Sequence, residues 1–92
     1  MERNDMIRKH ILFSGRVQGV GFRYRSCYIA QMLGLTGWVT NTWDDRVEME
    51  VQGEEKSINK MIELLHEQNF VVIEDMEVNE IPLCEESGFR VR

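Results

Sequence analysis

The sequence lacks long hydrophobic runs and contains a single proline. No apolar run approaches the roughly 20 residues that a membrane-crossing helix needs, and the polar start MERNDMIRKH lacks the apolar centre of a signal peptide. We therefore expect a cytoplasmic protein with no membrane partner. Its 92 residues suffice for one domain, predicted over residues 1–92, although a domain cut from a larger chain would show the same features.

Cysteine is also scarce, because Cys27 and Cys84 are the only two in the chain. They form no CxxC pair and no metal-type cluster with His10 or His66, so the sequence predicts no metal site. Two reduced thiols are favoured over one disulfide, which would need an oxidising compartment.

Positive charge is scarce and unevenly placed in a chain of net charge −5. Residues 1–39 carry six Lys/Arg against two Asp/Glu, net +4, and residues 40–92 carry five against fourteen, net −9. A duplex DNA binder normally has a broad basic face, for which this chain has too few cations. A small anion needs only a local basic pocket, which the first half can supply.

The hydrophobic periodicity predicts two helices between short strands. Residues 22–33 have helical spacing before Gly34, and 54–69 are amphipathic with acidic residues in the first turn. Alternating or apolar runs bounded by turn residues predict strands at 7–15, 36–41, 46–53, 70–81 and 88–92. The resulting β-α-β-β-α-β order, with a last small strand, predicts an α+β, ferredoxin-like sandwich. It has an antiparallel sheet with two helices on one face.

A stretch rich in glycine and arginine, SGRVQGVGFRYR, joins the first predicted strand to the first helix. Gly15, Gly19 and Gly21 allow positive φ angles and leave no Cβ in the way, so backbone N–H groups can converge on an anion at the helix N-terminus. Arg23 falls in the first helical turn, where its planar guanidinium can bind two phosphate oxygens. The alternative is a flexible loop with solvated arginines, since the spacing matches neither a Walker A loop nor the dinucleotide-binding fingerprint.

The glycine- and arginine-rich stretch also resembles the sequence of a known protein family. GRVQGVGFRYR closely resembles the signature of the acylphosphatase family, GLTGWVTNTWDDRVEMEVQG resembles its second block, and the likeness runs from His10 to the closing GFRVR. The resemblance implies the fold predicted above. It also implies hydrolysis of small acyl phosphates to a carboxylate and phosphate, without metal or cofactor.

Residue by residue, the resemblance implies a phosphate site and a water site. Arg23 corresponds to the family's phosphate-binding arginine, and Asn41 to its catalytic asparagine, which orients the attacking water. The backbone amides that would hold the phosphate, within loop 16–22, are those of Gln18, Gly19, Val20, Gly21 and Phe22.

Several positions depart from the family pattern. Thr40 stands where a basic residue is frequent, and Asp45 stands where glycine is common, so Asp45 is expected in the left-handed region. EQNFVVIED replaces a Gly-Pro between the second helix and the fourth strand. Trp43 is interpreted either as an exposed platform for the acyl part of a substrate or as a packed or merely surface aromatic.

Other conspicuous side chains have structural interpretations. We expect Trp38, Met49 and the apolar stripe from Ile58 to Leu65 in the core. His10 and His66 have no identifiable partners and are expected at the surface or in a strand.

Two further functional hypotheses remain open at this point. The first is a binding module that only holds a phosphate or carbamoyl-type anion. The second is a single-stranded RNA binder, which needs exposed aromatics on a basic sheet. The alternating strand carries Arg46, Glu48 and Glu50 instead, so we expect no nucleic-acid partner and, by default, a monomer.

Overall fold

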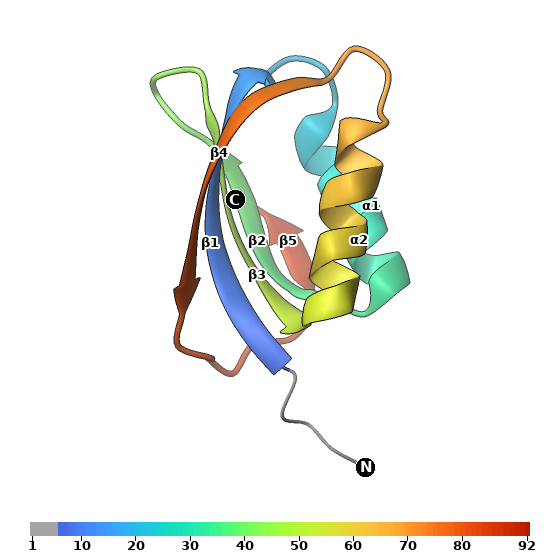
Figure 1. Ribbon diagram of the computed structural model, residues 1–92, viewed down its shortest axis with the longest axis vertical. Coiled ribbons are helices and arrows are strands. Elements are labelled where there is room, and N and C mark those ends of the chain that lie inside the picture. Colours follow the sequence, from blue (N-terminus) through green and yellow to red (C-terminus); the bar gives the residue numbers. More distant parts are fainter. Residues whose placement is uncertain (1–5) are drawn as a thin grey trace.

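Five strands form one sheet, and two helices cover one of its faces (Figure 1). The structure is a computed structural model that describes residues 6–92; residues 1–5, part of the polar start, lie outside the described residues. The elements are β1 (Met6–Arg16), α1 (Phe22–Leu33), β2 (Thr36–Asn41), β3 (Val47–Glu54), α2 (Glu55–His66), β4 (Val72–Ile81) and β5 (Phe89–Val91). This order confirms the predicted β-α-β-β-α-β arrangement with a final short strand.

The sheet has the strand order β4-β1-β3-β2-β5. The pairs β4–β1, β1–β3 and β3–β2 are antiparallel, but β5 pairs with β2 in parallel. The expectation of an antiparallel sheet was therefore wrong for its last strand, and the sheet is mixed. The parallel pair arises because the loop after β4 brings the chain back to the far edge before β5 begins.

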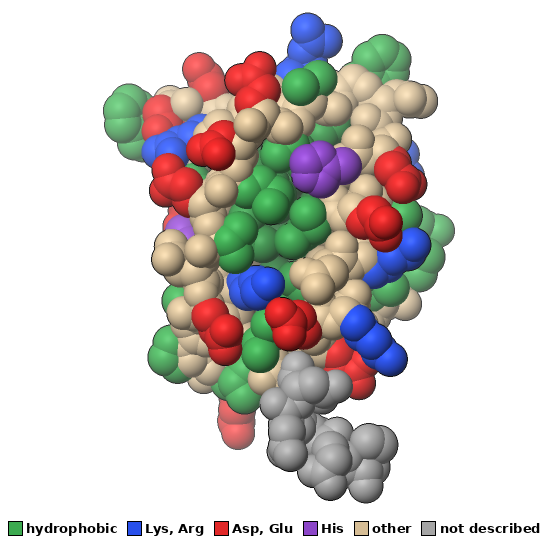
Figure 2. Space-filling view, viewed as in Figure 1, with side chains coloured by type: hydrophobic (Ala, Val, Ile, Leu, Met, Phe, Trp, Pro, Cys, Tyr) green, Lys and Arg blue, Asp and Glu red, His purple; other side chains and the backbone are tan. Residues whose placement is uncertain are grey.

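The core lies between the sheet and the helices. On β3, Val47, Met49 and Val51 are fully buried, as the period-two alternation predicts. On α2, Ile58, Met61 and Leu65 are fully buried. Figure 2 shows hydrophobic side chains gathered between β1 and α2, with polar side chains around them.

Trp38 corrects one expectation about the core. It lies on the opposite, open face of the sheet, because its neighbours Gly37 and Val39 occupy the buried positions of β2. There the Arg92 guanidinium stacks 4.2 Å from the centroid of the Trp38 ring. The indole is therefore half-buried under a cation rather than packed in the core.

The start of α1 is fixed over one row of the sheet. In the antiparallel register, Val47 is opposite both Phe13 on β1 and Asn41 on β2, so the three residues share the helix-covered face. Phe22, the first residue of α1, packs edge-on against Phe13 with ring centroids 4.9 Å apart. This contact places the N-terminus of α1 above the row that ends in Asn41.

The open face contains a buried arginine. Arg8, with 2% of its surface exposed, donates from Nε and Nη2 to Glu50 Oε1 at 3.0 and 2.8 Å. Its Nη2 also lies 3.0 Å from Glu86 Oε1, which ties the loop before β5 to the sheet.

None of the helices within residues 6–92 has the length and apolar character needed to cross a membrane.

Arg8→Gln should lower the free energy of unfolding by about 2–4 kcal/mol, because it leaves two partly buried carboxylates without their cation. Lys60→Gln is the matched control, since Lys60 pairs with Glu63 on the exposed surface of α2, and its cost should stay within about 0.5 kcal/mol. Urea unfolding of the two variants measures the difference. Equal losses would show that the Arg8 cluster contributes no more than a surface pair.

Candidate functional site

The glycines of this stretch have different structural roles, because Gly15 lies within β1 and only Gly19 and Gly21 lie in the loop before α1. Gly15 has φ 126°, and a Cβ there would overlap the Val72 carbonyl oxygen, so glycine is required by the close approach of β4. The expectation that Gly15 leaves room for a ligand was therefore wrong. Gly19 and Gly21 have φ 75° and 80°, and a Cβ at either would meet nothing within 4 Å. These two glycines therefore turn the backbone while open space remains beside it, as an approaching ligand would need.

Among residues 6–92, no side chain accepts a hydrogen bond from the N-terminus of α1. Gly21 is the N-cap, no side chain within residues 6–92 caps the helix, and the first turn contains no acidic residue. The first backbone bond of the helix is donated by Arg25 N–H to the Gly21 carbonyl, 3.0 Å away. The N–H groups of the first turn are therefore open, and the helix dipole adds a partial positive charge there.

The Gln18 side chain ties this loop to the turn after β2. Its amide Nε2 donates to the backbone carbonyls of Thr42 and Arg46, at 2.9 and 2.8 Å. Sequence reasoning assigned Gln18 only a backbone amide and missed this role. The one available signal was the side-chain amide itself, which carries two donors.

Asn41 ends β2, one residue before the carbonyl that Gln18 holds. Its Oδ1 is buried and accepts no hydrogen bond from residues 6–92. Such an unpaired acceptor lowers the free energy of unfolding by about 1–3 kcal/mol. Buried polar atoms are therefore normally paired with protein groups or with water. The Asn41 carboxamide oxygen is therefore an unpaired acceptor that can bind a water molecule or a ligand.

Arg23 lies one residue after the helix begins. The residue is half-buried, its guanidinium carbon lies 5.9 Å from the centroid of the Tyr24 ring, and it forms no ion pair with any residue of the described range. Its positive charge is thus not neutralised by a carboxylate. Together with the open amides of the first turn, Arg23 gives this end of an acidic protein a local attraction for anions.

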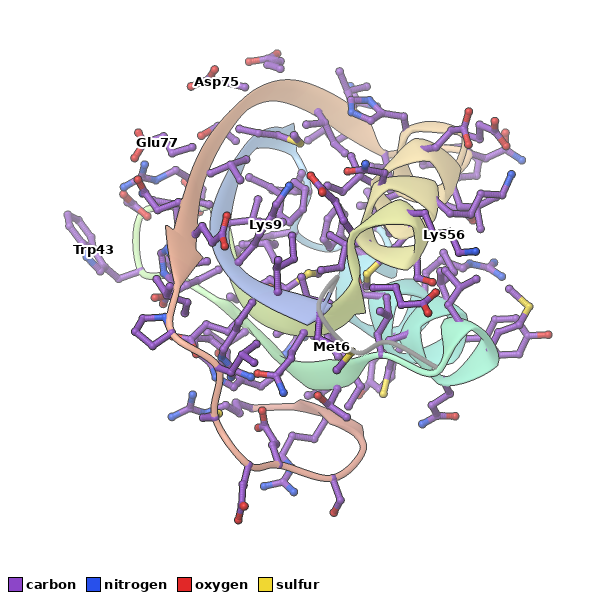
Figure 3. The ribbon with its side chains drawn as sticks, turned by 60° about the horizontal axis from the view of Figure 1, so that its bottom comes forward. Met6, Lys9, Trp43, Lys56, Asp75 and Glu77 are labelled. Atoms are coloured by element: carbon purple, nitrogen blue, oxygen red, sulfur yellow. The ribbon has the colours of Figure 1, made fainter. Side chains whose placement is uncertain are left out.

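The turn between β2 and β3 is closed by a compact polar network. Thr42 N–H donates to the Arg46 carbonyl at 2.9 Å, and Arg46 Nη2 lies 2.8 Å from Asp44 Oδ2. Asp45 has φ 71°, which confirms the left-handed conformation expected of it. Trp43 is 95% exposed and projects from the turn (Figure 3), which excludes the packed interpretation.

Outside the loop and the turn, the structure supplies partners that the sequence did not reveal. His10 Nε2 lies 2.8 Å from Glu48 Oε2 across the β1–β3 pair. The Thr40 hydroxyl donates to the Arg92 carbonyl at 3.0 Å, so this departure from the family pattern joins β2 to the end of the chain. Cys27 and Cys84 are both free, and residues 6–92 contain no group of three His, Cys, Asp or Glu side chains placed to hold a metal.

Known proteins match this chain over most of its length. The acylphosphatase family model matches residues 9–91. The acylphosphatase of Trichormus variabilis is 45% identical over 64 residues, or 70% of this chain and 63% of that protein, so the aligned part spans less than two thirds of this relative. The acylphosphatase of Roseiflexus sp. is 39% identical over 89 residues, 95% of this chain and 96% of that protein. Among solved structures, an acylphosphatase from Coxiella burnetii has a TM-score of 0.90 at 35% identity, covering 100% of this chain and 98% of that one.

The turn network predicts a pH dependence. Hydrogen bonds from Arg46 and from the Thr42 hydroxyl stabilise the Asp44 carboxylate and hold its pKa below the usual value. Because the pKa is lower in the folded state, this contribution to stability is present above the unfolded pKa and is lost as the pH falls through the folded one.

NMR titration of the Asp44 carboxyl should give a midpoint below that of an unstructured aspartate. The midpoint should rise toward the ordinary value in Arg46→Gln and stay unchanged in Arg90→Gln, a remote exposed arginine. An Asp44 midpoint that is the same in wild type and in Arg46→Gln would contradict the assignment.

Proposed function

The chain belongs to the acylphosphatase family, and we propose that it hydrolyses the carboxyl–phosphate bond of small acyl phosphates at the site formed by loop 16–22, Arg23 and Asn41. The observation that carries this proposal is the buried, vacant Oδ1 of Asn41, next to a loop that Gln18 fastens to the same turn. A vacant acceptor beside open backbone donors and an uncompensated arginine supports a site for an anion and a water molecule together.

In this proposal the phosphoryl group is held by the backbone amides of residues 18–22 and by the Arg23 guanidinium. These donors are fixed before the substrate arrives, so they stabilise the developing charge without reorganisation. The glycine conformations and the uncapped start of α1 support this assignment, because they leave space beside Gly19 and Gly21 and leave the first N–H groups of α1 without a side-chain cap.

The chemical step needs little from the protein. The oxygen of a water molecule attacks phosphorus in line, the bond from phosphorus to the acyl oxygen breaks, and its electron pair leaves with the carboxylate. The water proton passes to a phosphate oxygen. Since a carboxylate is a stable leaving group at neutral pH, no general acid is required, and positioning with electrostatic stabilisation suffices.

Asn41 is assigned the positioning of that water. A carboxamide has both an acceptor and donors, so it can orient a water molecule without acting as a strong base. The mechanism uses no cofactor and no metal. The proposal extends to a single catalytic domain over residues 1–92 that acts as a monomer in the cytoplasm, and the two free cysteines agree with a reducing compartment.

Arg23→Gln and Asn41→Ala should each lower kcat/KM for benzoyl phosphate by about 10²–10³, the usual cost of removing one preorganised group. Arg90→Gln, which removes an exposed cation from β5, should retain wild-type activity. Circular dichroism and thermal unfolding verify that the variants fold. Near-wild-type turnover in either site variant would refute its assignment. A folded wild-type protein that binds phosphate without hydrolysing benzoyl phosphate would be a binding module instead.

Gly19→Ala and Gly34→Ala test the loop against a matched glycine. Gly34 has φ 72° and open space around it, like Gly19, but it ends α1 at the opposite end from the loop. Both substitutions should cost about 1–2 kcal/mol of stability, because alanine is strained at these angles. Only Gly19→Ala should raise the inhibition constant of inorganic phosphate as a competitive inhibitor, by tenfold or more. Equal inhibition constants in the two variants would place the phosphate away from the loop.

A further inference from the structure

Phe70 is held in an unfavourable conformation without being buried. Its φ is 71°, in the left-handed region where a bulky side chain is a genuine outlier, and 75% of the residue is exposed. An aromatic side chain in such a position gains little from packing against its own protein. Strain of this kind persists where the surrounding structure enforces it, and it concentrates at binding and catalytic sites.

The residues on either side of Phe70 enforce its conformation. Gln68 Nε2 donates to the Leu64 carbonyl of α2 at 3.1 Å, and Gln68 N–H donates to the Leu65 carbonyl at 3.3 Å. Val71 N–H donates back to the Gln68 carbonyl at 3.4 Å, and Val71 is buried with 8% exposed. The turn from 68 to 71 is thus anchored at both ends, while most of the Phe70 side chain stays exposed at the surface.

The Phe70 turn lies beside the loop that precedes α1, at one end of the molecule (Figure 1). Between them is a cavity of about 250 Å³, lined by Val20, Gly21, Arg25 and residues 68–71. An apolar cavity of about 150 Å³ holds a benzene molecule, so this volume accommodates an aromatic ring. Val20 and Gly21 belong both to this cavity and to the proposed phosphate loop.

We propose that this cavity, hereafter the Phe70 cavity, receives the acyl group of the substrate, with the Phe70 ring as its apolar wall. This inference rests on the proposed acylphosphatase function. Val20 adds a second apolar surface, and an aromatic face prefers a flat partner. Phe70 is therefore the residue that sets how strongly this chain discriminates flat apolar acyl groups from acetyl.

Arg25 fits the same assignment. It lines the Phe70 cavity, is exposed, and forms no ion pair with residues 6–92. The leaving carboxylate takes its negative charge at the acyl end of the substrate. A cation in the wall of the acyl cavity attracts the anionic substrate before cleavage and the carboxylate product after it.

A second exposed aromatic side chain, that of Trp43, is less suitable. Trp43 lines a cavity of about 440 Å³ together with Asn41, Asp44, Arg46 and Glu48. The two carboxylates of this cavity outnumber its one arginine, which already pairs with Asp44. The Phe70 cavity instead contains an arginine and no carboxylate, so it attracts an anionic substrate more strongly. Trp43 also lacks the backbone strain that marks Phe70.

The test compares benzoyl phosphate with acetyl phosphate in wild type, Phe70→Gly, Phe70→Tyr and Trp43→Ala. Phe70→Gly should lower the benzoyl-to-acetyl ratio of kcat/KM by about three- to tenfold, the range typical of one lost aromatic contact. Acetyl phosphate hydrolysis should be nearly unchanged. Phe70→Tyr should restore the ratio, and Trp43→Ala should leave it as in wild type. Because glycine relieves the strain, the unfolding midpoint of Phe70→Gly should rise by about 2–5 °C.

The outcomes separate this inference from the proposed function. A wild-type protein that hydrolyses neither substrate overturns the function, and this inference with it. If wild type hydrolyses both but Phe70→Gly retains the wild-type ratio, the acyl group lies elsewhere and only this inference is overturned. The same holds if Trp43→Ala changes the ratio instead. A lower unfolding midpoint together with equal losses on both substrates would show that Phe70 serves the fold rather than the substrate.

Discussion

Two hydrogen bonds from the Gln18 side chain hold the candidate site together. They join the loop before α1 to the turn after β2, across 24 and 28 residues of sequence. Connecting loops are the mobile part of a fold, and a misplacement of about 1 Å costs on the order of 10²-fold in rate. Because both donors of one amide contact carbonyls of one turn, Gln18 fixes the distance and the orientation between the loop and Asn41. The geometry proposed for catalysis depends on this tether more than on any single contact of the core.

The arrangement of charges follows the division of the fold into two faces. On the open face, carboxylates have cationic or histidine partners: Arg8 with Glu50, and His10 with Glu48. Arg23, in the first turn of α1, has no such partner within the described residues. A chain of net charge −5 can therefore bind an anion at this loop, because the Arg23 charge is not neutralised and the nearest open-face carboxylates have partners of their own.

Local signals in the sequence predicted the elements that surround the site. The bounds of α1 and β2 are those predicted, because periodicity and Gly34 define the helix end, and Asp45 adopts the conformation expected from its place in the turn. The features that were not predicted depend on partners distant in sequence. The parallel pairing of β5, the position of Trp38 under Arg92 and the side-chain bonds of Gln18 follow from strand order and register, which no local pattern specifies. The roles of the individual site residues came from the family resemblance and stay predictions.

The locally unfavourable features of the structure gather around the loop. Asn41 has a buried acceptor without a partner in the described residues, and Phe70 and Asp45 are the non-glycine residues with positive φ among them. Selection for stability alone would place glycine at position 70 and a hydrogen-bond donor beside Asn41. Natural sequences retain strained residues and unpaired polar atoms of this kind where function needs them. The fully buried residues of β3 and α2 supply the compensating stability. The unpaired Asn41 acceptor and the exposed Phe70 ring therefore match the two ends of one substrate, a phosphoryl group with its attacking water at one end and an apolar acyl group at the other.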